Sequence, residues 1–334
     1  MLHKKNYPAA DRIREIIVQN SRGFGKDWEF CTVQGPIKVT RNCVLYKTGF
    51  TDRQLAIKLF HPAHTSPGQV KKYYSALCEY YQNMDTEKGL LVPRPYKIIQ
   101  EQRILIMDWI PGPSLGRQLL RPDFSGGLRE NCIRAAARWL QRFHKAGGVR
   151  KFSLDTRPIL DKLQNSLQRA ELGKKIFGMD SKLEQIYKTI YNCSYLAEEV
   201  YIPHAPVHAD FTPNNLFYDS QSIWGIDFLP RKKAPVTEDI CRFLAYLNVY
   251  RLKFVSSRSL LQEYRYDREV FIDAYQRTGI ERSLLDWLQL VEVLRRLASV
   301  KSQLNSRLRQ PLRLAEMRRL EKFAGQLSGY LDAV

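Results

Sequence analysis

The residues with the clearest chemical potential lie in one short stretch of the chain. Asp210 stands on a predicted tight loop, Asn215 follows five residues later, and a second carboxylate, Asp227, lies twelve residues beyond that. Two short apolar runs flank Asp219–Ser222, a pattern that predicts a hairpin. Antiparallel strands on either side of such a turn can bring Asn215 and Asp227 together. Two oxygen ligands that converge on one hard cation are the usual protein contribution to a Mg²⁺ site.

This arrangement leaves Asp210 free to face an incoming hydroxyl group. Phosphoryl transfer requires positioning, neutralisation of phosphate charge and a group that orients the nucleophile, and these residue types supply all three. A plainer interpretation is that Asp210 and Asn215 only cap their own loop through backbone hydrogen bonds. We predict Asp210 as the catalytic residue and Asn215 and Asp227 as metal ligands.

The flanking sequence indicates which elements position these residues. Short β-branched or aromatic runs predict strands over 28–33, 43–47, 54–60 and 103–108. One helical segment, roughly Gly68–Met84, interrupts them. After Pro111-Gly112-Pro113 the apolar period becomes helical, and Pro206–Phe228 is the one exception because it carries the hairpin. A β-rich first part is therefore followed by a mainly helical second part.

At this point the sequence resembles the aminoglycoside phosphotransferase and choline kinase superfamily, the small-molecule branch of the protein-kinase-like fold. The family's HGDxxxxN and IDF motifs find their counterparts in His208–Asn215 and Gly225–Phe228. By spacing, Asn215 rather than Asn214 takes the metal-ligand place. Ala209 stands where the family usually has glycine. The resemblance covers roughly residues 28–245 and implies an α+β, bilobal kinase-like fold with ATP and Mg²⁺ as cofactors.

The resemblance also assigns nucleotide-binding residues. Lys58, near the end of a predicted strand, resembles the kinase lysine that grips the α- and β-phosphates. Its partner should be a helical glutamate, and Glu79 is the sole acidic residue between Lys58 and Asp85. An ordinary surface pair is the alternative interpretation of Lys58 and Glu79. The segment that ends the last strand resembles the family's hinge, which implies that backbone groups of Asp108, Trp109 and Ile110 hold adenine.

The same resemblance divides the chain into a nucleotide-binding lobe over 1–108 and a helical lobe over 109–334. The helical lobe would carry the catalytic loop and the acceptor site. The loop over 35–42, where the family covers the nucleotide, holds a single glycine, so its phosphate contacts are left open. His208 is expected to brace the catalytic loop, and His144 to pack or cap at a helix end.

Composition fits a folded enzyme. Hydrophobic residues make up 44% and charged residues 26% of 334 residues, which excludes a disordered or fibrous chain. No run is long enough for a membrane span, and the opening residues lack a signal peptide's apolar stretch, so a cytoplasmic protein is expected. Six cysteines lie singly and far apart, without the spacing of a zinc site or a disulfide framework.

The chain is strongly basic, with a formal net charge of +19. The most biased stretch, Arg295–Arg319, holds eight Arg or Lys residues against Glu316 alone. Such a segment is either a solvated helix face or a surface for something anionic, such as the inner face of a membrane. No specific nucleic-acid partner is predicted.

Together these features predict an ATP-dependent kinase that moves the γ-phosphate to a hydroxyl of a small molecule or sugar. A protein substrate is disfavoured because His208 lacks a following arginine and no A-P-E segment is present. One alternative is a lipopolysaccharide-core or glycan sugar kinase at the inner membrane face. An alternative from another class is a pseudokinase or a protein that binds an anionic polymer. Acceptor recognition is expected in 115–205 and 245–334, and the acceptor itself is not identified by the sequence.

Overall fold

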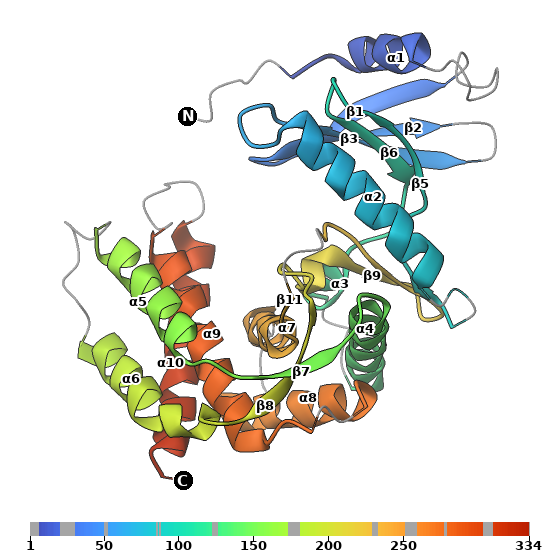
Figure 1. Cartoon of the computed structure of the whole chain (residues 1–334). Helices are drawn as coiled ribbons and strands as arrows, with labels where there is room; N and C mark the ends of the chain where they lie inside the picture. Colours follow the sequence, from blue (N-terminus) through green and yellow to red (C-terminus); the bar gives the residue numbers. More distant parts are fainter. Residues whose placement is uncertain are drawn as a thin grey trace. The chain divides into compact units, whose positions relative to one another are not determined.

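The computed structural model describes residues 7–20, 31–49, 53–84, 86, 88–121, 126–172, 181–228, 233–250, 259–276, 279–302 and 310–333. The chain divides into two compact units, which are described separately below (Figure 1). The first unit comprises Met1–Gly112 together with Trp224–Leu229, and the second comprises Pro113–Ile223 and Pro230–Val334. A short segment from the second half of the chain therefore belongs to the first unit, and this segment contains Asp227.

The first unit is built on a five-stranded antiparallel sheet in the order β1-β2-β3-β6-β5. Its strands are β1 (Thr32–Val39), β2 (Cys43–Gly49), β3 (Gln54–Phe60), β5 (Pro95–Ile99) and β6 (Ile104–Asp108), whereas β4 (Leu90–Leu91) belongs to another sheet, next to β10 (Ile223–Gly225). Two helices, α1 (Ala10–Gln19) and α2 (Pro67–Asn83), accompany the sheet (Figure 1). The register pairs Leu45 with Lys58 and Lys58 with Leu105, so these three residues lie on one face.

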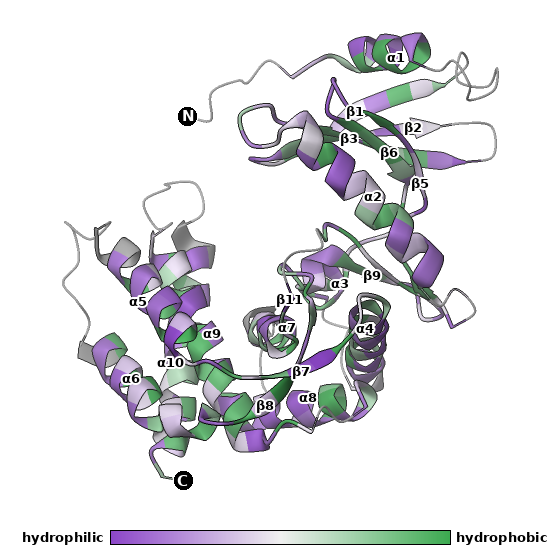
Figure 2. Cartoon of the chain, in the orientation of Figure 1, coloured by the Kyte–Doolittle hydropathy of each residue, from purple (hydrophilic) through white to green (hydrophobic). Residues whose placement is uncertain are grey.

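The two faces of this sheet have different roles. The hydrophobic core contains Ile13 of α1 with Tyr46, Ile57 and Ile106 of the strands. Strand β6, next to the central strand β3, is coloured as hydrophobic over most of its length (Figure 2). Because side chains alternate along a strand, Lys58 points to the opposite face, where α2 packs against β5 and β6. The alternation therefore separates a purely apolar face from one that carries a cation.

The sequence predicted most of this sheet, and the helix predicted over Gly68–Met84 is α2. Three details differ. Residues 28–30 of the strand predicted over 28–33 lie outside the described residues, and β1 continues past Gly35 to Val39, with a register irregularity between Gln34 and Lys38. Gly35 permits this bulge because its φ of +132° suits only glycine. Neither α1 nor β5 was predicted: Ile13 and Ile17 of α1 do lie at helical spacing, whereas β5 has only five residues.

The second unit is mainly helical. Its helices are α3 (Leu115–Gln118), α4 (Gly127–Ala146), α5 (Arg157–Leu172), α6 (Ser181–Asn192), α7 (Thr237–Tyr250), α8 (Leu260–Ala274), α9 (Arg282–Ser302) and α10 (Gln310–Leu331). Trp139 of α4 and Trp287 of α9 are fully buried and anchor the packing. No helix in the described part of the chain is long and apolar enough to cross a membrane.

Short strands accompany these helices. The predicted hairpin is present: β9 (Leu216–Tyr218) and β10 (Ile223–Gly225) lie on either side of a turn closed by the Asp219 N–H and the Ser222 carbonyl. A second antiparallel sheet, in the order β11-β8-β7, was not predicted. It consists of β7 (Arg150–Ser153), β8 (Tyr201–Pro206) and β11 (Lys233–Pro235). These strands are short, and β8 and β11 contain prolines, which sequence rules assign to turns.

Candidate active site

Lys58 lies on β3 and is almost fully buried, with 8% of its surface exposed. Its Nζ donates to the Asp227 carboxylate in an ion pair within the first unit. Burial alone would lower the pKa of Lys58, but the adjacent Asp227 carboxylate outweighs it and raises the pKa. The ammonium group therefore stays charged, which is the state needed to bind phosphate.

Aromatic rings, rather than Glu79, surround this ammonium. Nζ of Lys58 lies 5.0 Å from the ring centre of Phe60 and 5.6 Å from that of Tyr73, and the two rings are 5.2 Å apart. Such cation–ring contacts stabilise a buried ammonium. The structure corrects the predicted pairing: Glu79 is exposed, and in the described residues its carboxylate pairs with no cation.

The helical period explains this correction. Tyr73 and Leu77 of α2 line the small cavity beside Lys58 and so define the face of the helix that meets it. A residue two positions after Leu77 lies about 200° further round an α-helix. Glu79 therefore points away from the sheet, and Tyr73 takes the place beside Lys58 that the sequence had given to a glutamate.

The Ile226–Phe228 segment holds Asp227 in position. Asp227 has a φ of +63°, a left-handed conformation that aspartate tolerates better than most residues. The ring of the next residue, Phe228, packs edge-on against Tyr80 of α2 at 5.1 Å. Asp227 and Phe228 also line the cavity that contains Lys58. The aromatic contact thus fixes the carboxylate next to the lysine.

In the predicted hinge, Asp108–Ile110, two of the three backbone N–H groups already donate hydrogen bonds within the protein. The Asp108 N–H donates to the carbonyl of Arg94, and the Trp109 N–H donates to the carbonyl of Gln54. The Asp108 carboxylate is also occupied, since it accepts from the Arg94 N–H and the Tyr96 hydroxyl. Within the described residues, the Ile110 N–H is the donor of this trio that makes no hydrogen bond.

In the second unit, the loop that carries Asp210 is anchored by Asp239. This carboxylate, at the start of α7, is fully buried. It accepts hydrogen bonds from the backbone N–H groups of His208 (2.7 Å) and Ala209 (2.9 Å) and from Nε2 of His144 (3.1 Å). Burial favours the neutral acid, but these hydrogen bonds prevail and lower the pKa of Asp239. The loop is thus tied to α4 and α7 by one ionised carboxylate.

The two histidines have structural positions, as the sequence predicted. Nδ1 of His144 lies 2.7 Å from the Tyr275 hydroxyl, so the ring bridges Tyr275 and Asp239. Nδ1 of His208 accepts from the Asp210 N–H at 3.3 Å. His208 is buried among aromatic rings, including Trp139 at 6.0 Å. Neither imidazole is exposed to an incoming reactant.

Asp210 and Asn215 are brought together by this loop. Asp210 is exposed, and Nδ2 of Asn215 donates to both its carbonyl oxygen and its Oδ2, each at 2.9 Å. Because the amide nitrogen is fully used, Oδ1 of Asn215 remains as an acceptor with no donor among the described residues. One amide therefore fixes the Asp210 carboxylate and presents an oxygen of its own.

Oδ1 of Asn215 and the Asp227 carboxylate each present an oxygen of the kind that a hard cation such as Mg²⁺ prefers. No group of three His, Cys, Asp or Glu residues within the described ranges could hold a metal by itself. Asn215 belongs to the second unit and Asp227 to the first.

Ala209 adopts a strained backbone conformation. Its φ is +67°, in the left-handed region that a residue with a Cβ adopts only at a cost. The hydrogen bond from its N–H to Asp239 holds it there. This explains physically why the family usually has glycine at this position, a departure that the sequence alone showed but did not explain.

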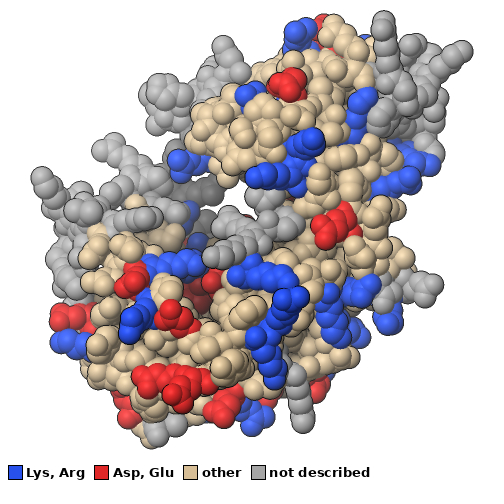
Figure 3. Space-filling model, in the orientation of Figure 1, with Lys and Arg blue, Asp and Glu red and all other residues tan. Residues whose placement is uncertain are grey.

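Three of the eight basic residues in Arg295–Arg319 form ion pairs within the helical unit, and Arg318 is exposed. Arg295 pairs with Glu292, Arg296 with Glu316, and Lys301 with Glu321. The sequence holds eight basic residues against one acidic residue in Arg295–Arg319. Glu292 and Glu321, two of the acidic partners, lie just outside this stretch, so the count overstated its excess of positive charge. Arg307 and Arg309 lie outside the described residues. On the face seen in Figure 3, Lys and Arg are scattered rather than gathered over one element.

The sequence is similar to a known family. The sequence profile of the phosphotransferase enzyme family matches residues 46–268, which is more than half of the 334 residues. No curated protein matches the chain. The matched range includes Lys58, Asp210, Asn215 and Asp227.

Solved structures resemble the chain over most of its length. A glucosamine kinase in complex with glucosamine, ADP and inorganic phosphate has a TM-score of 0.63 at 14% identity, covering 97% of this chain and 89% of that one. A choline kinase from Cryptosporidium parvum Iowa II has a TM-score of 0.61 at 13% identity, covering 96% of each chain. A spectinomycin phosphotransferase in complex with ADP and spectinomycin has 0.57 at 14%, covering 98% and 99%. These likenesses confirm the predicted α+β kinase-like fold.

The Asp239 anchor predicts a pH-dependent stability. Asp239→Asn should lower the free energy of unfolding by about 3 kcal/mol at pH 7, because it leaves buried donors without a charged acceptor. A depressed pKa in the folded protein adds stability above the unfolded value of about 3.9, and this stability is lost as the pH falls toward the folded value. In urea unfolding, the gap between wild type and variant should therefore shrink below about pH 3.9. The anchoring role of Asp239 would be contradicted if the difference in free energy of unfolding between wild type and Asp239→Asn stayed constant down to pH 2. It would also be contradicted if the exposed control Asp161→Asn showed the same difference.

The strain at Ala209 predicts a stabilising glycine. Ala209→Gly should raise the free energy of unfolding by about 0.5–1 kcal/mol, since relief of the left-handed strain exceeds the added entropy of the unfolded chain. Ala315→Gly, at an exposed position of α10, is the matched control and should lower it by about 1 kcal/mol. Chemical denaturation measures both. Destabilisation by Ala209→Gly would show that the position is not strained.

Proposed function

Because the chain belongs to the phosphotransferase enzyme family, we propose that it transfers the γ-phosphate of ATP to a hydroxyl group of a small molecule or sugar. The observation that carries the proposal is the Asp210 carboxylate, exposed on a loop anchored by Asp239 and oriented by the Asn215 amide. A loop that served only to cap itself would not require a buried ionised anchor from another helix.

Asp210 is the proposed base. Its Oδ2 is held by Asn215, so the exposed carboxylate is fixed in direction while it remains accessible to an acceptor hydroxyl. The carboxylate orients that hydroxyl and accepts its proton as the oxygen attacks the γ-phosphorus. The bond from the γ-phosphorus to the bridging oxygen of ADP breaks in the same transfer. ADP leaves, and the phosphorylated acceptor is released.

The first unit, which runs past the predicted 1–108 boundary to Gly112 and includes Trp224–Leu229, is the proposed nucleotide lobe, and the second unit is the proposed acceptor lobe. The buried, charged Lys58 would bind the α- and β-phosphates. The free N–H of Ile110 would donate to adenine, whereas those of Asp108 and Trp109 are already used by the sheet. Asn215 and Asp227 would hold Mg²⁺, which neutralises phosphate charge when bound. Use of ATP is consistent with the expected cytoplasmic location.

The two alternative functions gain less support. A lipopolysaccharide-core or glycan kinase at the membrane face remains within the same chemistry, but Arg295, Arg296 and Lys301 are engaged in ion pairs rather than presented to an anionic surface. A pseudokinase or polymer-binding protein would not need the charged Lys58 next to Asp227 together with the oriented Asp210. We therefore retain the small-molecule kinase as the proposed function.

Removal of the proposed base tests this function directly. Asp210→Ala should reduce phosphate transfer from ATP to the best member of a panel of amino alcohols, sugars and aminoglycosides by about 10³-fold or more. Its MgATP affinity should stay within about tenfold, because Asp210 contacts the acceptor rather than the nucleotide. Asp161→Ala, an exposed acid on α5, is the control. Retention of more than a tenth of wild-type transfer in Asp210→Ala would reject the role.

The surroundings of Lys58 give a separate prediction. Tyr73→Ala should weaken MgATP binding by about three- to thirtyfold, in line with a cation–ring contact of about 0.5–2 kcal/mol. Tyr73→Phe should keep most of the affinity because the ring is retained. Glu79→Ala should have no effect. Calorimetric titration of MgATP into all three variants shows whether Tyr73 or Glu79 supports Lys58. A loss of MgATP affinity in Glu79→Ala alone would contradict the role of Tyr73 and support the glutamate predicted from the sequence.

A further inference from the structure

A second basic stretch lies in the second unit, apart from Arg295–Arg319. Between Glu130 and Asp155 the sequence holds six Arg or Lys residues and no Asp or Glu. This stretch comprises most of α4 and all of β7. None of its basic residues is assigned above to nucleotide, metal or base. The proposed kinase reaction therefore does not account for the surface that they form.

Helix α4 presents cations on its solvent-facing side. Arg138 and Lys145 are exposed and lie seven residues apart in the chain, which is about two turns of an α-helix. Arg142, between them, is half-buried. The other side of the helix, which includes Leu140 and Phe143, is fully buried. The two exposed cations therefore project from the same side of α4 into solvent.

Strand β7 follows α4 in the chain and adds further cations (Figure 1). It is an edge strand, because its sheet has the order β11-β8-β7, and all of its residues are exposed. Arg150 and Lys151 belong to this strand. Lys233 of β11 lies near them, since its Nζ is 3.7 Å from the position that a Cβ on Gly148 would occupy. Cations of β7 and β11 thus lie beside the turn that leads out of α4.

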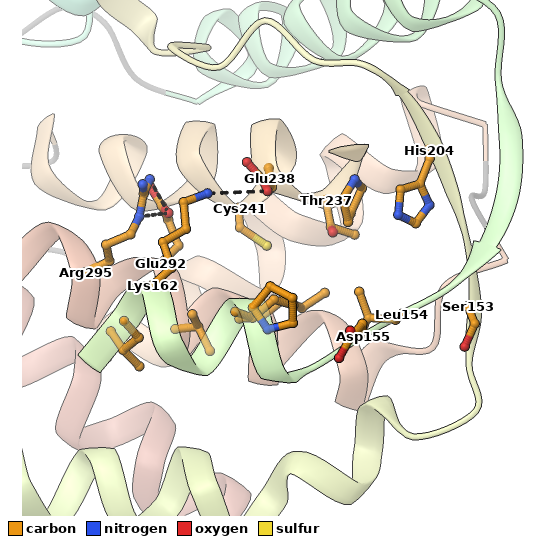
Figure 4. A pocket seen from close by; sticks show the side chains of 16 residues that line it. Ser153, Leu154, Asp155, Lys162, His204, Thr237, Glu238, Cys241, Glu292 and Arg295 are labelled. Atoms are coloured by element: carbon orange, nitrogen blue, oxygen red, sulfur yellow. Dashed lines mark hydrogen bonds and ion pairs between the residues drawn. The ribbon is translucent and has the colours of Figure 1, made fainter. Parts of the chain in front are cut away.

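The exposed cations of this region, which we call the α4–β7 surface, are Arg138, Lys145, Arg150, Lys151 and Lys233. Within the described ranges, none of the five forms an ion pair. Arg134, at the start of the same stretch, does pair with Glu130 and Asp273. The cations on the wall of the cavity in Figure 4 also have acidic partners, as the dashed lines show. Positive charges without counter-ions repel one another, and an anionic partner would remove this repulsion.

Two exposed apolar side chains lie among these cations. Val149, directly before Arg150, is 43% exposed, and Phe152, directly after Lys151, is 47% exposed. An edge-on contact with His204, at 5.2 Å between ring centres, holds the ring of Phe152. The interfacial region of a bilayer accepts such side chains next to cations that contact phosphate headgroups, whereas a nucleic acid is bound mainly through its phosphates. The mixture of cations and apolar groups therefore favours a lipid surface as the anionic partner.

We propose that the α4–β7 surface binds the protein reversibly to an anionic lipid bilayer. Its cations contact the headgroup phosphates, and Val149 and Phe152 enter the interfacial region. Each basic residue near such a surface raises the affinity about fivefold, so several together support peripheral binding. The proposal places the membrane contact on a different surface from Arg295–Arg319, the segment that the sequence suggested. It is independent of the proposed function, because lipid binding requires neither nucleotide nor acceptor.

Co-sedimentation of the full chain with lipid vesicles tests this proposal. The protein should bind vesicles made of equal parts of phosphatidylcholine and phosphatidylglycerol, and it should not bind vesicles of phosphatidylcholine alone. Binding should weaken as the salt concentration rises, because exposed charges are screened over about 8 Å at physiological ionic strength. These two measurements on wild type decide the electrostatic part of the proposal without any variant.

Charge reversal locates the surface. Lys145→Glu/Lys151→Glu should weaken binding to the anionic vesicles by about thirtyfold or more, because two attractive charges are lost. Arg318→Glu/Lys322→Glu, which reverses two exposed cations of α10, is the matched control and should bind like wild type. Val149→Ser should weaken binding about threefold and leave the salt dependence unchanged, because it removes an apolar contact and no charge. All of these side chains are exposed, so circular dichroism should show folded variants.

Several results would overturn the proposal. One is equal binding, or no binding, of wild type to the two kinds of vesicle. A second is an equal loss of binding in the α10 control, which would show that net charge rather than the α4–β7 surface decides. A third is binding of wild type to a single-stranded RNA oligonucleotide but not to vesicles, with the RNA binding lost in Lys145→Glu/Lys151→Glu. That result would assign the surface to nucleic acid instead.

Discussion

A single buried carboxylate sets the geometry of the candidate active site. Asp239 has no contact with solvent, and an ionised group in that position is tolerated only if several donors surround it. The donors come from His144 on α4 and from the backbone of His208 and Ala209. The loop must therefore run past the start of α7 in one conformation, even at the cost of a strained Ala209. Asp210, the next residue of the loop, is therefore held in a fixed position.

The first unit contains a buried cation, the Lys58 ammonium, which must likewise be stabilised by its neighbours. Strand alternation turns Lys58 away from the aliphatic core and toward α2, where Asp227 and two aromatic rings keep it charged. The Asp210 loop is thus held by hydrogen bonds to an anion, and Lys58 by an ion pair and ring contacts. These two sets of contacts lie in different units, so each can be tested separately.

The sequence predicted the parts of this site that depend on spacing along the chain. The strand containing Lys58, helix α2 and the loop with Asp210 and Asn215 were all identified by local pattern. Features that depend on three-dimensional packing were not. Glu79 was predicted as the partner of Lys58 because it is the sole acidic residue between Lys58 and Asp85. Which side chain contacts Lys58 depends instead on the face that α2 turns toward the sheet, and that face carries Tyr73. The role of Asp239 likewise depends on packing, because only the folded structure shows which N–H groups it binds.

The proposed kinase function requires Lys58 to bind the phosphates of ATP and Asp227 to bind Mg²⁺, and the most direct measurement is calorimetric titration of ATP at increasing Mg²⁺ concentrations. Wild type should bind ATP more tightly as Mg²⁺ rises, because a hard cation needs the charged oxygen that Asp227 provides. Asp227→Asn should lose most of that dependence, and Lys58→Met should weaken ATP binding at every Mg²⁺ concentration. Identical Mg²⁺ dependence in wild type and Asp227→Asn, with ATP affinity unchanged in Lys58→Met, would contradict the account.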